Sequence, residues 1–506
     1  MVGWREKSLN YRPPEIIDSS TAHPAPINFP TSLLPIPMIM SCRLLKSSRH
    51  AFIAFLGVAS LTAADQRPNI LFIAIDDLRP ELGCYGAPQV KSPQIDRFAA
   101  TAVRFDRAYC QVPVCGASRA SLMTSILPTA SRFTVADSSV DGHAPGVATL
   151  PHVFKDAGYV TIANGKVYHS PKDNREGWSE APWVVEAGHA SSFDPESQRE
   201  RSPTGRGRIY EHPDVPDNAY ADGKIAEKTI QDLRRFKQSG QPFLLFCGFI
   251  RPHMPFYAPK KYWDLYDRKD IIVAENRSRP EKAPAALQGS AEFKQYHLGE
   301  YQPNTDAFHR MMRHGYLASV SYTDKLVGDV LTALEDLGLA QNTIVVLWGD
   351  HGWNLGEHDF WGKHNTMHTA LRVPLIVRAP GLEKGVSKAL VASVDIFPTL
   401  CALAKVEAPS TVQGRSFVNL LEKPDRKFRD MIYSRFRAGD TALTERFSYT
   451  SYGKNGEMLY DLLKDPAENH NVVASPEYRG DYERMKQLLA GAMQEAAQAK
   501  LPVAAK

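Results

Sequence analysis

Residues 70–77, Ile70-Leu71-Phe72-Ile73-Ala74-Ile75-Asp76-Asp77, join a short unbroken apolar run to two carboxylates. An apolar run of this length without alternation is typical of a strand that is buried on both faces of a sheet. Such strands belong mainly to α/β folds, in which helices cover both faces. The run therefore predicts a largely parallel sheet between two layers of helices.

Two further runs of the same kind follow much later in the chain. Residues 243–249 precede Arg251-Pro252-His253, and residues 343–348 precede Gly349-Asp350-His351-Gly352. Before the last run, apolar residues between positions 320 and 337 recur with the spacing of an amphipathic helix. This alternation of strands and helices favours an α/β domain with a mostly parallel central sheet.

The chain of 506 residues is long enough for one large domain and a smaller one. Near residue 425 the pattern changes to short segments with Gly and Asp turns, followed by a helix predicted around residues 482–498. We therefore expect a large domain over residues 66–425 and a C-terminal α+β subdomain over residues 426–506. Residues 171–218 are polar and rich in Pro, Gly and Ser, which predicts a long loop facing a ligand.

The first 64 residues have the order of a secretory signal. Basic residues lie within 43–49, an apolar run covers 51–59, and small residues follow at 62–64. The run is too short to anchor the chain in a bilayer, although an uncleaved signal anchor is the alternative. We expect a secreted or periplasmic protein without stable membrane insertion, with Met38 or Met40 as a possible true start. The net charge of +4 is spread along the chain, which argues against nucleic-acid binding.

Acidic and histidine residues stand where two of the predicted strands end: Asp76-Asp77 and Asp350-His351. Ligands of open α/β sheets bind at the carboxyl ends of strands. Both Asp76 and Asp77 can face one cation only if the chain leaves strand geometry there; on their own they could equally cap a helix or form a turn. Oxygen-rich ligands favour Ca²⁺ or Mg²⁺, whereas His351 leaves room for Mn²⁺ or Zn²⁺.

The most specific pattern is Val114-Cys115-Gly116-Ala117-Ser118-Arg119-Ala120-Ser121-Leu122-Met123-Thr124-Ser125. Taken alone, Cys115 would be a buried structural thiol, because cysteine is among the most buried residue types. The whole pattern resembles the signature of the type I sulfatase family, Cys-x-Pro/Ala-Ser-Arg before a helix of small and apolar residues. Ala117 stands where many members have proline, and Ser125 where many have glycine.

Other stretches extend the resemblance over roughly residues 67–475. The stretches that resemble the family in general are residues 92–99, 165–169, 348–352, 361–364, 459–462 and 465–468. Residues 251–256, Arg251-Pro252-His253-Met254-Pro255-Phe256, are similar to a stretch of the iduronate-2-sulfatase branch.

The resemblance implies an alkaline-phosphatase-like large domain with a smaller C-terminal α+β subdomain. It also implies hydrolysis of a sulfate ester on a carbohydrate, such as a sulfated uronic acid or another sugar released by polysaccharide degradation. A formylglycine-generating enzyme would oxidise Cys115 to formylglycine, whose hydrate is the nucleophile. One divalent cation, expected to be Ca²⁺ with Mg²⁺ or Mn²⁺ as alternatives, would bind Asp76, Asp77, Asp350, His351 and the residue made from Cys115.

The same resemblance assigns roles to five further residues. Arg119 would hold the diol of the hydrated formylglycine, and Lys166 and Lys363 would supply positive charge to the transition state. His169 would assist the diol, and His253 would protonate the leaving alkoxide as a general acid. A packing or surface histidine is the simpler alternative for either imidazole.

Two other functions fit parts of the sequence. A metal-dependent phosphohydrolase or phosphonate hydrolase can share this fold and metal set, but Lys166, His169 and His253 point to sulfate. A carbohydrate-binding protein that has lost catalysis would have damaged ligand positions, whereas every expected position in this sequence is filled.

Overall fold

The computed structural model describes residues 67–186 and 191–502. The predicted signal peptide within residues 1–64 lies outside the described residues, so secretion stays a prediction. Among the described helices, none combines the length and the apolar character needed to cross a membrane.

An eight-stranded sheet forms the centre of the large unit, as the apolar runs predict. Its strands are β1 (Asn69–Ile75), β2 (Val103–Tyr109), β3 (Val160–Gly165), β5 (Phe243–Phe249), β7 (Thr343–Gly349), β10 (Arg372–Val373), β11 (Leu375–Arg378) and β12 (Gly385–Ala392). They run in the order β10-β2-β11-β7-β1-β5-β3, and β12 pairs with β2. The neighbours β7, β1, β5 and β3 are parallel, whereas β11 is antiparallel to both β7 and β2.

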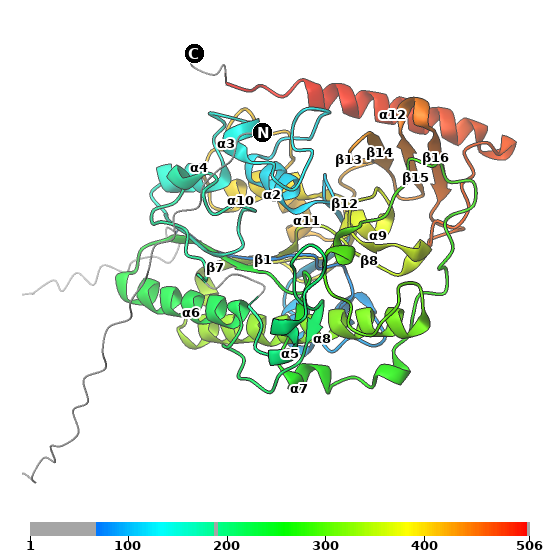
Figure 1. The fold of residues 1–506 in the computed structure, drawn as a ribbon. Coiled ribbons are helices and arrows are strands. Elements are labelled where there is room, and N and C mark those ends of the chain that lie inside the picture. Colours follow the sequence, from blue (N-terminus) through cyan, green and yellow to red (C-terminus); the bar gives the residue numbers. More distant parts are fainter. Residues whose placement is uncertain (1–66, 187–190, 503–506) are drawn as a thin grey trace, which may run out of the picture. The chain divides into compact units, whose positions relative to one another are not determined.

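Side chains of β1 alternate between two hydrophobic cores, one on each face of the sheet: Phe72 belongs to one core and Ile73 to the other. Both are fully buried, which explains why the run lacks polar residues. Figure 1 shows α6 and α8 below the sheet and α2, α4 and α10 above it. The predicted α/β sandwich of helices around a mostly parallel sheet is confirmed.

The described helices are α1 (Pro93–Ala99), α2 (Cys115–Thr124), α3 (Val140–His143), α4 (Leu150–Asp156), α5 (Pro195–Arg199), α6 (Ala221–Ser239), α7 (Lys260–Trp263), α8 (Asp306–Asp336), α9 (His368–Leu371), α10 (Ile396–Leu403), α11 (Val418–Glu422) and α12 (Arg479–Ala497). The helix predicted from residue 320 is the second half of α8. Its first half buries Arg313, which donates to Glu81 at 2.9 Å, and His314, which bonds the Trp263 carbonyl at 2.8 Å. Because these polar residues lie on the buried face, the apolar spacing of a helix is not recognisable in the first half of α8.

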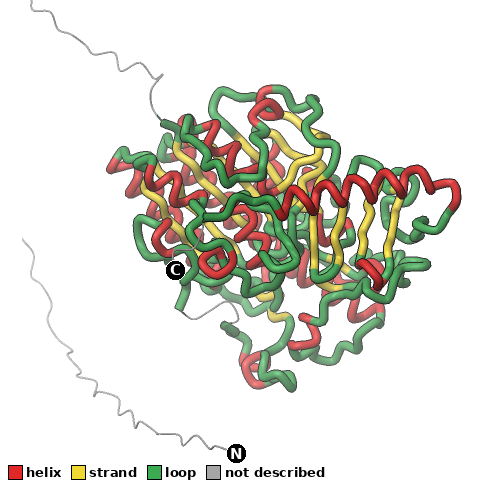
Figure 2. The backbone as a smooth tube through the Cα atoms, turned by 90° about the horizontal axis from the view of Figure 1, so that it is seen from above, coloured by secondary structure: helices red, strands yellow, loops and turns green. Residues whose placement is uncertain are grey.

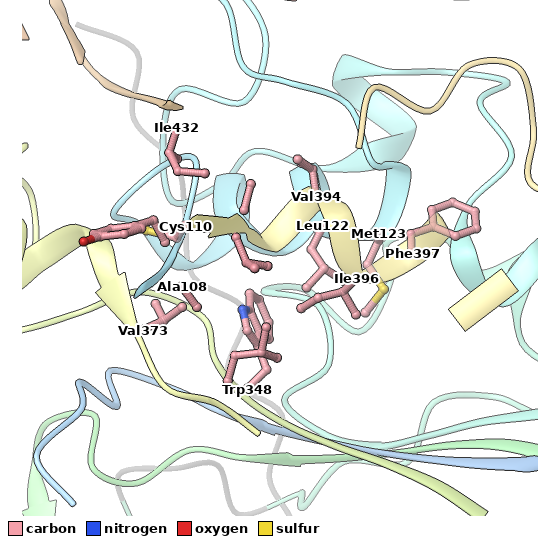
Figure 3. Packing of buried hydrophobic residues seen from close by; sticks show 14 of the residues in the cluster. Ala108, Cys110, Leu122, Met123, Trp348, Val373, Val394, Ile396, Phe397 and Ile432 are labelled. Atoms are coloured by element: carbon pink, nitrogen blue, oxygen red, sulfur yellow. The ribbon is translucent and has the colours of Figure 1, made fainter. Parts of the chain in front are cut away.

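A four-stranded antiparallel sheet forms most of the C-terminal part. Its strands, in spatial order, are β13 (Ile432–Phe436), β14 (Gly439–Leu443), β15 (Phe447–Ser451) and β16 (Glu457–Asp461). Helix α12 contacts β13, β14 and β15, and Figure 2 shows it lying across this sheet. The hydrophobic core above the large sheet continues into this sheet, and Figure 3 shows Ile432 of β13 in the same cluster as Trp348 of β7.

Residues 171–218 carry few regular elements, as their composition predicts. They contain α5 and the short strand β4 (Tyr210–Glu211), which pairs with β6 (Phe256–Tyr257). Another small pair, β8 (Asn354–Leu355) with β9 (Trp361–Gly362), follows the end of β7. The predicted domain boundary at residue 425 stays a prediction.

The continuous core predicts that the two sheets unfold together. Replacing Leu443, which is fully buried in β14, by alanine should cost about 2–5 kcal/mol, because it leaves a cavity in the shared core. Scanning calorimetry should show one transition that moves to lower temperature as a whole. Leu463→Ala is the control, because Leu463 is 68% exposed. Two transitions, with only one of them moved by Leu443→Ala, would contradict a shared core.

Candidate active site

The carboxyl ends of four neighbouring parallel strands meet at one edge of the large sheet. Asp76-Asp77 follow β1, Asp350-His351 follow β7, His253 comes after β5, and Lys166 follows β3. These positions lie far apart in the sequence, and the strand order β7-β1-β5-β3 brings them together. The edge is where open α/β sheets bind their ligands.

Asp77 provides the break in strand geometry that two adjacent ligands require. Its φ is +60°, a left-handed conformation that is uncommon for residues other than glycine. Its backbone N–H donates to Asp350 Oδ1 at 3.1 Å, and its carbonyl accepts from the Tyr316 hydroxyl at 2.9 Å. These bonds hold the turn, so that ligand atoms of Asp76 and Asp77 lie within 4.8 Å of one another, Cys115 and His253.

The ring of His351 gives the best evidence that this site suits a cation. Its Nδ1 lies 3.0 Å from the Gly352 carbonyl, which can only accept, so Nδ1 carries the proton. Its Nε2 then presents a lone pair 3.4 Å from Asp77 Oδ1 and 3.6 Å from Asp350 Oδ1.

Asp76 Oδ1 is also buried and lacks a hydrogen-bond partner among the described residues. A buried lone pair among carboxylate oxygens is unfavourable without a positive charge between them. The donor set of carboxylates and one imidazole therefore fits a divalent cation.

Cys115 is the first residue of α2, with its sulfur 3.3 Å from His351 Nε2. The residue after it must be glycine, because a Cβ on Gly116 would lie 1.8 Å from the Ala136 carbonyl oxygen. Burial and the neighbouring Asp76 raise the pKa of the Cys115 thiol to about 12. A thiol with such a pKa is a poor nucleophile at neutral pH. The start of a helix also favours anion binding.

The two departures from the family signature are compatible with the local structure. Ala117 is fully buried inside α2. Ser125 ends the helix with a φ of +54°, and its hydroxyl donates to the Val394 carbonyl at 2.6 Å and accepts from the Gly414 N–H at 3.1 Å. These side-chain bonds offset the strain of a left-handed residue where glycine would be free of it.

Arg119 is fully buried and connects the helix to two strand ends. Its Nε donates to Asp350 Oδ2 at 2.9 Å, and its Nη1 donates to the carbonyls of Lys166 and Val167. These hydrogen bonds go to Asp350 and to the backbone after β3 and not to Cys115. The expected role of Arg119, to hold the diol of the hydrated formylglycine, therefore stays a prediction.

Two lysines neutralise the aspartate pair. Lys166 Nζ contacts Asp76 Oδ2, and Lys363 Nζ lies 2.9 and 3.1 Å from the two oxygens of Asp77. Burial opposes ionisation of Asp76, but the surrounding cations, Lys166 above all, hold the pKa of its carboxyl well below its ordinary value. Burial and the charge of Asp76 raise the pKa of Asp77, against the opposing effect of Lys363.

Glu292 is a residue of this site that the sequence did not reveal. Its carboxylate lies 3.2 Å from His253 Nε2 and 3.0 Å from Lys363 Nζ. Burial disfavours its charge, but Lys363 and His253 hold its pKa well below the ordinary value. Glu292 begins a single short 3-10 turn within a segment without periodicity or motif, so no sequence signal marks it.

His169 lies at the edge of the site. Its side chain is 34% exposed, and its Nε2 is 3.7 Å from Asp137 Oδ1. Burial and the nearby Lys166 lower its pKa to about 4, so the imidazole is neutral at pH 7. In contrast, His253 has a ligand atom within 4.8 Å of Cys115. The separate roles expected for these two histidines stay predictions.

Comparison with known families assigns the chain. A family model described as Sulfatase matches residues 68–406. The chain belongs to the sulfatase family. A second model, described as N-sulphoglucosamine sulphohydrolase, C-terminal, matches residues 356–495 of this sulfatase.

Relatives agree with this membership and with the resemblance to the iduronate-2-sulfatase branch. Iduronate 2-sulfatase of Mus musculus is 34% identical over 415 residues, which cover 72% of this chain and 74% of the relative. A protein solved in complex with its substrate, D-glucosamine-2-N,6-O-disulfate, has a TM-score of 0.72 at 23% identity, covering 86% of this chain and 99% of that one. The alkaline-phosphatase-like fold and the sulfatase resemblance are confirmed.

The phosphonate monoester hydrolase of Agrobacterium radiobacter has the same TM-score of 0.72 at 23% identity, covering 85% of this chain and 96% of that one. Likeness at this identity shows a shared fold only. The family match favours sulfate over the phosphonate alternative, and the chain is an enzyme of the sulfuric ester hydrolase class.

Glu292 should matter for catalysis through the two side chains that it holds. Glu292→Gln keeps the shape but removes the charge facing His253 and Lys363. We expect kcat/KM on an aryl sulfate to fall about 10- to 100-fold, the range for loss of a residue that orients a reacting group. Glu281→Gln, at a side chain 71% exposed, is the control. Unchanged kinetics in a folded Glu292→Gln enzyme would refute this role.

Proposed function

We propose that this sulfatase hydrolyses a sulfate ester on a carbohydrate, such as a sulfated uronic acid, by means of a formylglycine made from Cys115. The observation that carries the proposal is the position of Cys115 Sγ, 3.3 Å from His351 Nε2 and grouped with Asp76 and Asp350. The mouse relative is named for iduronate sulfate, and the solved neighbour binds a glucosamine disulfate. Both names support a sulfated sugar as substrate.

The burial of Cys115 supports an early modification. The residue is only 2% exposed and begins a helix that is buried along its whole length. A formylglycine-generating enzyme would need to reach the cysteine before the chain folds around it. We infer that conversion precedes folding, since the folded protein hides both Cys115 and Arg119.

Asp76, Asp77, Asp350 and His351 would hold the cation, together with the oxygen of the modified residue 115. Carboxylate oxygens in this number favour Ca²⁺, with Mg²⁺ or Mn²⁺ as alternatives. When bound, the ion would act as a Lewis acid that polarises the sulfate oxygens.

The remaining residues would position the sulfate and move protons. The start of α2 and the ammonium groups of Lys166 and Lys363 favour the anionic sulfate group and the charge that grows on it during the reaction. Arg119 would hold Asp350 in position relative to residue 115. His253 would give a proton to the leaving sugar oxygen, and His169 would assist at the nucleophile.

The proposal also includes the organisation predicted from the sequence. Residues 1–64 would direct the chain out of the cytoplasm as an extension with a signal peptide. Residues 66–425 would form the catalytic domain, and residues 426–506 the C-terminal subdomain.

Cys115→Ser tests the nucleophile. A serine ester of sulfate has no second hydroxyl to expel the sulfate group, so turnover should stop after one covalent event. Sulfate release from sulfated uronates and hexosamines, measured by ion chromatography, should fall to background in this variant. Cys401→Ser, at a buried thiol of α10, is the matched control. Full turnover by Cys115→Ser would contradict the proposal.

Asp350→Asn tests the cation site without an activity assay. A ligand that binds only the folded state raises stability with the logarithm of its concentration relative to Kd. Added Ca²⁺ should therefore raise the melting temperature of the chelator-treated wild type, and this gain should be lost in Asp350→Asn. An equal gain in both proteins would mean that Ca²⁺ binds elsewhere.

A further inference from the structure

A small pocket is lined by residues 364–366, which directly follow Lys363 in the chain, and by the turn that joins β13 to β14. Its volume is about 130 Å³, and its lining includes His364, Asn365, Phe436 and Arg437. We call it the Arg437 pocket. The pocket is linked to the catalytic centre by the backbone, because His364 directly follows Lys363. The N–H of His364 also donates to the Pro113 carbonyl at 3.4 Å.

Two donors in this pocket lack protein partners among the described residues. Asn365 is 2% exposed; its Oδ1 accepts from the Met367 N–H at 3.1 Å, which fixes the amide so that Nδ2 is the donor left over. Arg437 is exposed and forms no ion pair within 4 Å with a described carboxylate. A buried unpaired donor is costly, and it becomes favourable when a ligand supplies an acceptor.

Two residues that line the pocket have a left-handed backbone. Arg437 has a φ of +52° and His364 a φ of +73°. Arg437 is the first of two residues between β13 and β14, a position where tight hairpins favour glycine when φ is positive. Strain retained at a place where another residue would relieve it is typical of functional sites.

Contacts with the ring of Phe436 fix the side chains of His364 and Arg437. The imidazole of His364 stacks on Phe436 with ring centroids 5.5 Å apart and 4° between the planes, and its Nδ1 lies 2.9 Å from Ser290 Oγ. The guanidinium of Arg437 lies over the same phenyl ring, 5.3 Å from its centroid. Phe436, at the end of β13, thus orients the guanidinium of Arg437 at the pocket.

We propose that the Arg437 pocket binds a second anionic group of the substrate, beyond the sulfate ester that is cleaved. The volume is about that of four water molecules, enough for a carboxylate or sulfate group with an adjoining carbon. The guanidinium of Arg437 would pair with the anion, and Asn365 Nδ2 would donate to it. This inference rests on the proposed function and extends it: the substrate is a sugar with two anionic groups.

Pairs of substrates distinguish the two sources of that anion. One pair is a sulfated uronic acid and the same sugar with its carboxyl group reduced to hydroxymethyl; the other is a disulfated hexosamine and its monosulfated form. Wild type should prefer the more anionic member of at least one pair by about 10- to 100-fold in kcat/KM, the value of a hydrogen bond to a charged group. The pair that shows the preference identifies the anion as carboxylate or sulfate.

Arg437→Gly should abolish this preference by raising KM about 10- to 100-fold with kcat little changed. Its kinetics on 4-nitrophenyl sulfate should stay as in wild type, and its melting temperature should not fall, because glycine relieves the left-handed φ. Arg484→Ala, at an exposed arginine of α12, is the control. Equal losses on the aryl sulfate, or no preference in wild type for either pair, would overturn the proposal.

A binding measurement separates this inference from the proposed function. If wild type hydrolyses no sulfate ester, the proposed function fails, but the pocket can still be measured by calorimetric titration of Cys115→Ala with the sulfated uronate and the disulfated hexosamine. The variant Cys115→Ala/Arg437→Gly should bind the preferred sugar about 10- to 100-fold more weakly. The same Kd in both variants would overturn the role of Arg437.

Discussion

The burial of several carboxylates at one sheet edge is the constraint on which the rest of the site depends. Asp76, Asp77 and Asp350 have no exposed surface, and two like charges 4 Å apart repel by about 4 kcal/mol at an effective dielectric constant of 20. With Glu292, four carboxylates face the cations of Arg119, Lys166 and Lys363. If all four carboxylates were ionised, one negative charge would stay unbalanced, and burial raises the pKa of Asp77 against that state. A divalent cation would supply the positive charge that the carboxylates lack.

The fold supplies the positions that this balance needs. Four adjacent parallel strands bring their carboxyl ends together, and α2 adds Cys115 and Arg119 from above the sheet. Arg119 holds Asp350 and the backbone after β3 in one network. The C-terminal sheet shares the core of the large one and carries Phe436 and Arg437 to the neighbouring pocket. Catalysis and recognition therefore depend on both sheets.

Much of this arrangement could be predicted from the sequence, because its strongest signals are local. Apolar runs mark β1, β5 and β7, and each ends in a polar residue of the site. Glu292 could not be predicted as a site residue, because only the fold brings its segment, which has no sequence pattern, beside Lys363. The start of α8 could not be predicted, because Arg313 and His314 interrupt its apolar face. Both side chains are nevertheless buried, since each forms a hydrogen bond inside the protein. The left-handed φ of Arg437 likewise has no sequence signal when the residue is not glycine.

The most direct measurement is peptide mass spectrometry of residue 115 in catalytically active protein. We expect the peptide to show the mass loss for replacement of the CH₂–SH side chain by an aldehyde, since the buried thiol with its raised pKa is a poor nucleophile. An unmodified Cys115 in a preparation that hydrolyses sulfate esters at full rate would contradict a formylglycine nucleophile.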